Sequence, residues 1–162
     1  MSTEINQRIT PFLWYDSQAE NAAKSYVSIF KNSKVGLITR YGETGPRPKG
    51  SVMTVGFTLD GQEFTALNGG PQFPFTEAIS LVVNCESQEE IDYYWEKLST
   101  GGREVQCGWL KDKFGLSWQI VPTKFFEMLK TASQEQLDRV MKALMEMVKL
   151  DLAKLEQAYN AK

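Results

Sequence analysis

A strand followed directly by a helix occurs twice in this sequence, and this repeat constrains the fold more than any other feature. Residues 9–15 (ITPFLWY) and residues 77–85 (EAISLVVNC) are apolar runs that suit buried strands. Each run is followed by a serine and a glutamate at the spacing of a helix-capping box: Ser17 with Glu20, and Ser87 with Glu90. Because the same order returns in both halves, the sequence predicts two units of one architecture.

Three further strands complete the first half. Residues 34–41 (KVGLITRY) predict a strand, and a loop rich in glycine and proline follows it. Residues 51–68 predict two strands joined by Asp60-Gly61, the strongest short signal of a β-hairpin. The first unit is therefore expected to have the order βαβββ over about residues 8–70.

The second half ends in short strands and then becomes helical. Apolar runs at 104–112 and 115–122 complete a second βαβββ unit over about residues 76–122. Residues from about 123 to 162 predict helices, whose expected caps are Thr123, Ser133 and Asp151. They carry an apolar stripe formed by Leu137, Val140, Met141, Leu144 and Val148. This stripe is expected either to pack on the protein's own core or to bind a partner.

Charge and residue usage exclude several classes of function. Eighteen basic and twenty acidic side chains give a formal charge of −2 without a basic run, so a nucleic-acid partner is not expected. The polar N-terminus and the lack of a long apolar run predict a cytoplasmic protein outside the membrane. Cys85 and Cys107 are expected to be core thiols. The chain has no histidine, which excludes Ser-His and Cys-His dyads and His-ligated zinc or iron.

Five segments of the chain carry a family resemblance: residues 9–15, 66–80, 82–99, 107–122 and 139–156. Together they resemble the PhnB-like branch of the vicinal oxygen chelate superfamily. This superfamily also holds glyoxalase I, extradiol dioxygenases and the fosfomycin and bleomycin resistance proteins. Members of the branch are often labelled 3-demethylubiquinone-9 3-methyltransferase-like. An S-adenosylmethionine site is expected to have a Gly-rich turn between a strand and a helix, followed by an acidic residue. The chain has no such turn, so its residues do not support the methyltransferase label.

The resemblance implies an α+β fold in which two βαβββ modules form a curved mixed sheet around a cavity, with the C-terminal helices as an extension of one glyoxalase-like domain. In metal-dependent relatives, His or Glu ligands from each module hold a divalent metal in this cavity. The corresponding positions here fall around 9–11, around 65–67, at about Ala78 and at Gln119, and none offers a strong ligand. Glu77 is the nearest carboxylate, but strand alternation is expected to turn it to the other face. We therefore expect no metal and no cofactor.

The remaining candidate site is an amide with polar and aromatic neighbours. The resemblance turns Gln119 toward the cavity and Trp118 toward a helix. Asn68, Gln119 and Ser80 are then candidates to orient a polar ligand, between Trp109 and Phe75 as apolar walls. Each has a structural alternative. Asn68 suits a turn before two glycines, both aromatic rings suit a core, and Gln119 can hydrogen-bond within the protein.

Two functions follow from this site, and a structural dimer without a ligand is a third possibility. The first is metal-free binding of a small molecule in the cavity between the sheets. The alternative is an enzyme of lyase, isomerase or transferase type acting on a small metabolite, with Glu77 or Tyr41 as acid-base group and with or without a divalent metal. The loop after residue 41, with Arg47 and Lys49, is expected either to close over an anionic ligand or to be a solvated hairpin loop. By resemblance, the chain is expected to form a homodimer.

Overall fold

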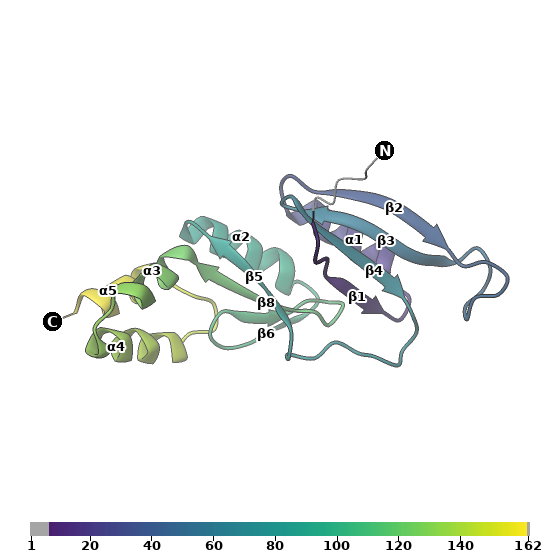
Figure 1. Ribbon diagram of the computed structural model, residues 1–162. Coiled ribbons are helices and arrows are strands. Elements are labelled where there is room, and N and C mark those ends of the chain that lie inside the picture. Colours follow the sequence, from purple (N-terminus) through teal and green to yellow (C-terminus); the bar gives the residue numbers. More distant parts are fainter. Residues whose placement is uncertain (1–6, 162) are drawn as a thin grey trace. The chain divides into compact units, whose positions relative to one another are not determined.

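The computed structural model describes residues 7–161, and the chain divides into two compact units, Met1–Pro74 and Phe75–Lys162. Each unit contains one four-stranded sheet with a helix packed on it (Figure 1). Residues 1–6, which supply most of the polar N-terminal segment considered above, lie outside the described residues. No helix in the described part of the chain is long and apolar enough to cross a bilayer.

The N-terminal unit has the predicted βαβββ order. It consists of β1 (Phe12–Tyr15), α1 (Ala19–Ile29), β2 (Lys34–Arg40), β3 (Val52–Leu59) and β4 (Gln62–Asn68). The strands lie in the order β1-β4-β3-β2, with β1 parallel to β4 and the other pairs antiparallel.

The turn between β3 and β4 and the packing of α1 follow from local sequence. Asp60 and Gly61 both have positive φ, 46° and 82°, as a tight type I′ hairpin turn requires, and Leu59 pairs with Gln62 across it. The predicted hairpin is thus confirmed. The buried face of α1 consists of Ala19, Ala22, Ala23 and Tyr26. Three alanines on that face let the helix approach β3 and β4 closely.

The C-terminal unit repeats this arrangement. It consists of β5 (Ser80–Cys85), α2 (Gln88–Ser99), β6 (Arg103–Glu104), β7 (Trp109–Lys111) and β8 (Ser117–Pro122). The strand order is β5-β8-β7-β6, and β5 is parallel to β8 as β1 is to β4. The structure confirms an α+β fold with two βαβββ modules. Each module forms its own four-stranded sheet, and no strand pairing among residues 7–161 joins the two.

Three helices follow β8: α3 (Thr123–Thr131), α4 (Gln134–Met145) and α5 (Leu152–Asn160). The expected caps at Ser133 and Asp151 are confirmed, and Ser133 forms a complete capping box with Gln136. Thr123 was expected to be a cap but is the first residue of α3; Pro122 occupies the N-cap position, and the Thr123 hydroxyl donates to the carbonyl of Cys85.

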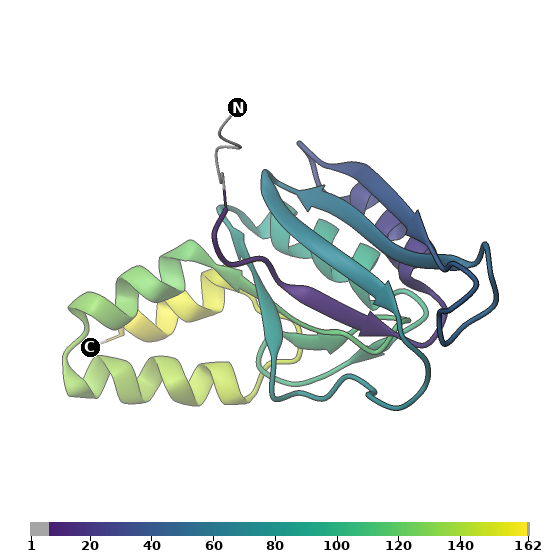
Figure 2. The same ribbon diagram turned by 45° about the vertical axis from the view of Figure 1, so that its right-hand side comes forward.

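The C-terminal helices share one core with the end of β8. This core contains Val121, Phe125, Met128, Val140, Leu144, Met147, Leu150 and Leu155, and α4 and α5 pack side by side (Figure 2). The apolar stripe is therefore divided. Val140 and Leu144 pack inward, whereas Met141 and Val148 remain 38% and 43% exposed.

Candidate functional site

The sheet of the C-terminal unit has one face covered by α2. Trp95 of α2 donates its indole N–H to the Glu104 carboxylate at 2.8 Å. Glu104 pairs with Leu110, and Leu110 pairs with Trp118, so these three lie in one row under the helix. Because side chains alternate along a strand, Gln119 lies on the opposite face.

Four polar residues form a continuous row across that opposite face. Strand register places Arg103 of β6 beside Lys111 of β7, Lys111 beside Ser117 of β8, and Ser117 beside Ser80 of β5. We call these four residues the polar row. Directly opposed residues have Cβ atoms about 5 Å apart, so neighbouring members of the row can contact the same group.

The neighbouring row mixes an amide with apolar groups. Gln119 lies between Trp109 of β7 and Val82 of β5. The Gln119 Nε2 amide donates to Ser80 Oγ at 2.9 Å, which ties this row to the polar row. Trp109 is half-buried and Val82 is exposed, so the face offers apolar surface beside its hydrogen-bonding groups.

Ser117 is the unusual member of the polar row. It is only 1% exposed, and its Oγ has no hydrogen-bond partner in the part of the chain that the structure describes. A buried polar group left unpaired costs about 1–3 kcal/mol. The Ser117 hydroxyl therefore remains able to bond to a group outside these strands.

Glu77 places a carboxylate next to the polar row. Its Oε1 lies 2.7 Å from Lys111 Nζ and 3.6 Å from an Arg103 nitrogen. The hydrogen bond from Lys111, assisted by a backbone N–H, holds the pKa of this carboxyl below its usual range. The expectation that Glu77 points away was wrong, because β5 begins only at Ser80 and strand alternation does not extend back to residue 77. Half-buried Phe75 lies in the same linker before β5.

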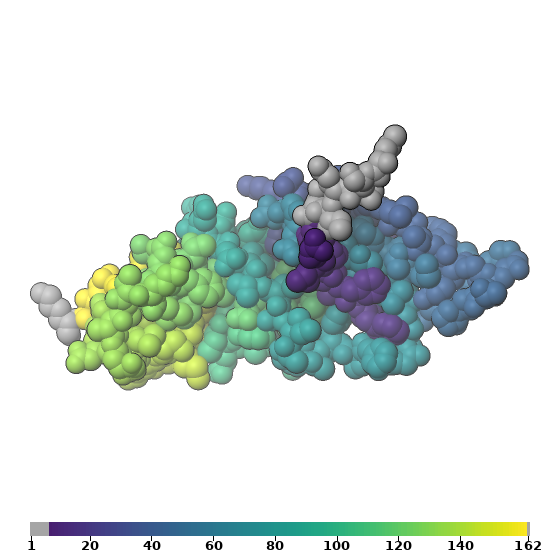
Figure 3. All heavy atoms as spheres, viewed as in Figure 1, coloured from purple at the N-terminus to yellow at the C-terminus, as the bar shows by residue number. Residues whose placement is uncertain are grey.

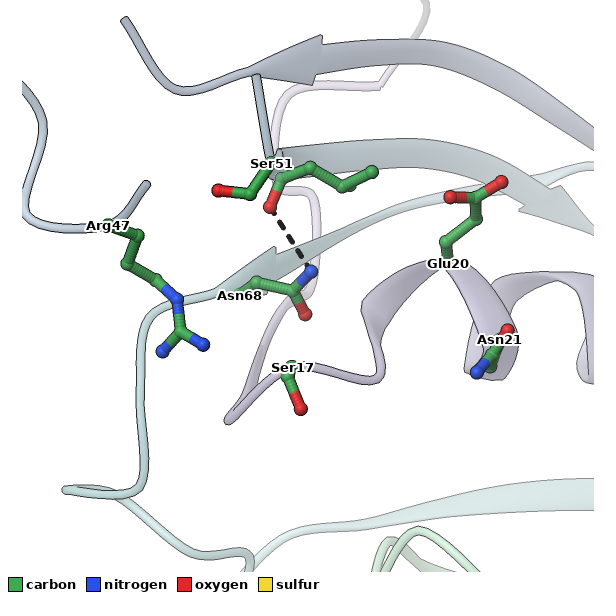
Figure 4. Close-up of a pocket in the computed structure, with 7 residues that line it drawn as sticks. Ser17, Glu20, Asn21, Arg47, Ser51 and Asn68 are labelled. Carbon is green, nitrogen blue, oxygen red and sulfur yellow. Dashed lines mark hydrogen bonds between the residues drawn. The ribbon is translucent and has the colours of Figure 1, made fainter. Parts of the chain in front are cut away.

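Tyr41 and Asn68 meet in the N-terminal unit, where both are buried. The Tyr41 hydroxyl donates to the backbone carbonyl of Asn68 at 2.7 Å. The Asn68 side chain accepts from Ala19 N at 2.8 Å. It donates to Val52 O at 3.2 Å, the bond dashed in Figure 4. These hydrogen bonds hold α1 against the end of the sheet. Of the two acid-base candidates, Tyr41 is buried and Glu77 is exposed.

Ser17 does not cap α1, contrary to the spacing of its sequence. Gln18 occupies the N-cap position and makes no side-chain capping bond. Asn68 supplies the capping oxygen from 49 residues along the chain. A capping motif of a few neighbouring residues cannot predict a cap that comes from so far along the chain.

A separate polar hollow lies beside the start of α1, with a volume of about 250 Å³. It is lined by Ser17, Glu20, Asn21, Arg47, Ser51, Val52 and Asn68 (Figure 4). The cations of the loop around it already have partners. Arg40 donates to Gly50 O, Lys49 pairs with Glu43, and an Arg47 nitrogen lies 3.4 Å from Asp16 Oδ1.

The residues on the face opposite α2 do not suit the divalent metal that the superfamily implies. Gln119 donates its amide N–H to Ser80, and Lys111 brings an ammonium group to the same face. A transition metal favours imidazole, thiolate or carboxylate ligands and is repelled by a neighbouring cation. Among residues 7–161, no three Cys, Asp or Glu side chains gather as a metal would require.

Comparison with known proteins places the chain in a family. The family model described as 3-demethylubiquinone-9 3-methyltransferase matches residues 7–121. The chain belongs to this family, which includes PhnB proteins. The match stops at residue 121, so residues 139–156, on which part of the resemblance rested, lie outside it. Comparison with curated proteins gives no significant match.

Solved structures agree with this PhnB assignment. The chain is 40% identical to the PhnB protein from Bacillus cereus, with a TM-score of 0.66, covering 72% of this chain and 100% of that one. Protein PA1353 from Pseudomonas aeruginosa is 18% identical, with a TM-score of 0.60 over 72% of this chain and 98% of that one. The fosfomycin resistance protein FosX from Listeria monocytogenes, complexed with Mn(II) and sulfate, is 16% identical, with a TM-score of 0.52 over 78% and 98%. The last two show the fold alone.

Proposed function

We propose that this PhnB-family protein binds a small, partly apolar molecule on the face of the C-terminal sheet opposite α2, without a resident metal. Gln119, Ser80 and Ser117 orient the polar groups of the ligand, and Trp109 contacts its apolar part. Half-buried Phe75 in the adjoining linker is a second apolar candidate.

The observation that carries this proposal is the unpaired Ser117 hydroxyl. It is buried beside Ser80 and Lys111 in register, so three polar groups lie together while one of them lacks a partner. If this position served only the fold, alanine would be favoured there, because alanine has no hydroxyl to leave unpaired. A hydroxyl there is favoured when something outside the strands accepts or donates a hydrogen bond. A small-molecule site usually combines a few polar groups with apolar surface, as this face does.

A pair of measurements on Ser117→Ala tests the proposal. The ligand-free variant should be as stable as the wild type or more stable by up to about 1 kcal/mol, because an unpaired hydroxyl is removed. The same variant should lose any molecule that copurifies with the wild type in native mass spectrometry. Ser28→Ala is the matched control, since the Ser28 hydroxyl is exposed and bonds only to a backbone carbonyl in α1.

Two results separate the possible outcomes. Clear destabilisation of Ser117→Ala, with ligand retained, would show that Ser117 serves the fold and would remove the basis of the proposal. Conversion of the bound molecule to a product, abolished in Glu77→Gln, would replace binding by catalysis as the function of this face.

A further inference from the structure

The charges in the polar row and beside it are unequal. Arg103 and Lys111 contribute two cations, and Glu77 is the carboxylate with which both form ion pairs. The three groups together therefore carry one net positive charge. The Lys111 side chain is only 23% exposed, so its ammonium is partly withdrawn from water and depends on a nearby anion.

The position of Glu77 allows its carboxylate to move away from Lys111 and Arg103. It lies in a turn before β5, outside the ladder of strand hydrogen bonds, and its side chain is 56% exposed. An ion pair at this degree of exposure is weak, because water screens it and a long side chain must be held in one geometry. Replacing the carboxylate by another anion at Lys111 therefore disrupts little of the fold.

Glu77 also satisfies the site incompletely. Its carboxylate reaches Lys111 and Arg103, yet the hydroxyl of Ser117, which neighbours Lys111 in register, has no partner among the described residues. The Ser117 Oγ has almost no exposed surface, so an oxyanion that replaces Glu77 must displace the side chains around this hydroxyl before it can accept from it as well as from Lys111. Hydrogen bonds from charged donors to such an anion are the stronger kind.

Building on the proposed function, we infer that the ligand of this face carries an oxyanion group and that Glu77 is its internal stand-in, which is displaced when the ligand binds. Carboxylate and phosphoryl groups share the chemistry that Lys111, Arg103 and Ser117 recognise. The carboxylate of Glu77 thereby lowers the apparent affinity of the free protein for such ligands and keeps the row from holding anions indiscriminately.

The test titrates the full-length protein with sodium phosphate and, separately, with sodium acetate, at constant ionic strength maintained with sodium chloride. Binding is followed by the NMR signals of the Trp109 indole N–H and the Gln119 side-chain amide. Glu77→Gln should bind the preferred anion about fivefold more tightly than the wild type, since it removes the competing carboxylate. Lys111→Met should weaken binding at least tenfold. Stronger binding of phosphate or of acetate identifies the kind of oxyanion.

Glu43→Gln is the matched control, because Glu43 is also an exposed carboxylate paired with a lysine, but in the N-terminal unit. It should leave both titrations unchanged. Equal or weaker anion binding by Glu77→Gln would overturn the inference. Failure of both anions to shift either signal would also overturn it, even if a neutral copurified molecule sensitive to Ser117→Ala left the proposed function standing.

Discussion

The side-chain oxygen of Asn68, the last residue of β4, accepts a hydrogen bond from the backbone N–H of Ala19, the first residue of α1, at 2.8 Å. The first N–H groups of a helix have no partner within it, so a cap must come from elsewhere. Here it comes from the end of a strand and fixes the helix to the sheet. The backbone carbonyl of the same asparagine accepts the Tyr41 hydroxyl, so the strand end also anchors the start of the loop after β2.

Asn68→Ala should lower the free energy of unfolding by about 2 kcal/mol, because it leaves a helical N–H and the Val52 carbonyl unsatisfied in a buried place. Ser17→Ala should change it by less than about 0.5 kcal/mol, as expected of a surface substitution outside such a network. Urea denaturation of both variants measures the difference. Equal losses would mean that Ser17 shares the capping role.

Asp112 determines the turn before β8, and its loss should be among the most damaging single changes. Its carboxylate is buried and accepts from Phe114 N, Leu116 N and the Trp118 indole, at 2.8, 3.1 and 2.8 Å. Asp112→Ala should cost about 3 kcal/mol or more, because three donors lose their acceptor. Asp138→Ala on the exposed surface of α4 is the control and should cost little. A small effect at Asp112 in urea denaturation would contradict this account.

The two cysteines should react at very different rates. Burial, with a smaller contribution from the charge of Glu90, raises the pKa of the Cys85 thiol to about 12. At pH 8 its thiolate fraction is therefore negligible, and only the thiolate is reactive. Cys107 is half-buried, so an aromatic disulfide reagent should label one thiol rapidly in the folded protein and both in urea. Cys107→Ser should abolish the rapid phase. Rapid labelling in that variant would show that Cys85 is accessible.

Purified protein should contain well under one equivalent of zinc, nickel, manganese or iron, because no histidine is available and Gln119 is a neutral donor. A chelator should then leave the melting temperature unchanged, since a bound metal would stabilise the folded state. Gln119→Glu alone should not create a tight site, because Lys111 lies on the same face. Stoichiometric metal by elemental analysis, lost in Gln119→Ala, would contradict this prediction.

Sedimentation should give a homodimer of about twice the 18.4 kDa chain mass. Met141 and Val148 of the apolar stripe remain 38% and 43% exposed, and Met145 beside them is 60% exposed, which leaves apolar surface available for a second copy. The α4 segment lies on the outside of the C-terminal unit (Figure 3). Met145→Glu should weaken the dimer without unfolding the chain, whereas Glu146→Gln next to it should not. A monomer at all concentrations would exclude the dimer.

The candidate site could be predicted from the sequence only in part. Alternation along β8 correctly separated Gln119 from Trp118, because the two-residue period of a strand holds wherever the strand continues. The same reasoning failed for Glu77, which precedes the strand and reaches Lys111 and Arg103 instead. Nor did the pattern reveal the polar row, since its four members come from four separate strands.

The sequence by itself determined the features that depend on neighbours along the chain. Asp60-Gly61 sets the hairpin, Ser133 and Gln136 set the start of α4, and apolar runs set the two βαβββ units, because turn, cap and strand preferences act over a few residues. Only the tertiary structure decided which residues far apart in the sequence are in contact. The capping of α1 by Asn68, the position of Glu77 at Lys111 and the unpaired Ser117 all depend on strand register and chain path, which bring together residues whose separation in sequence carries no information about their contact.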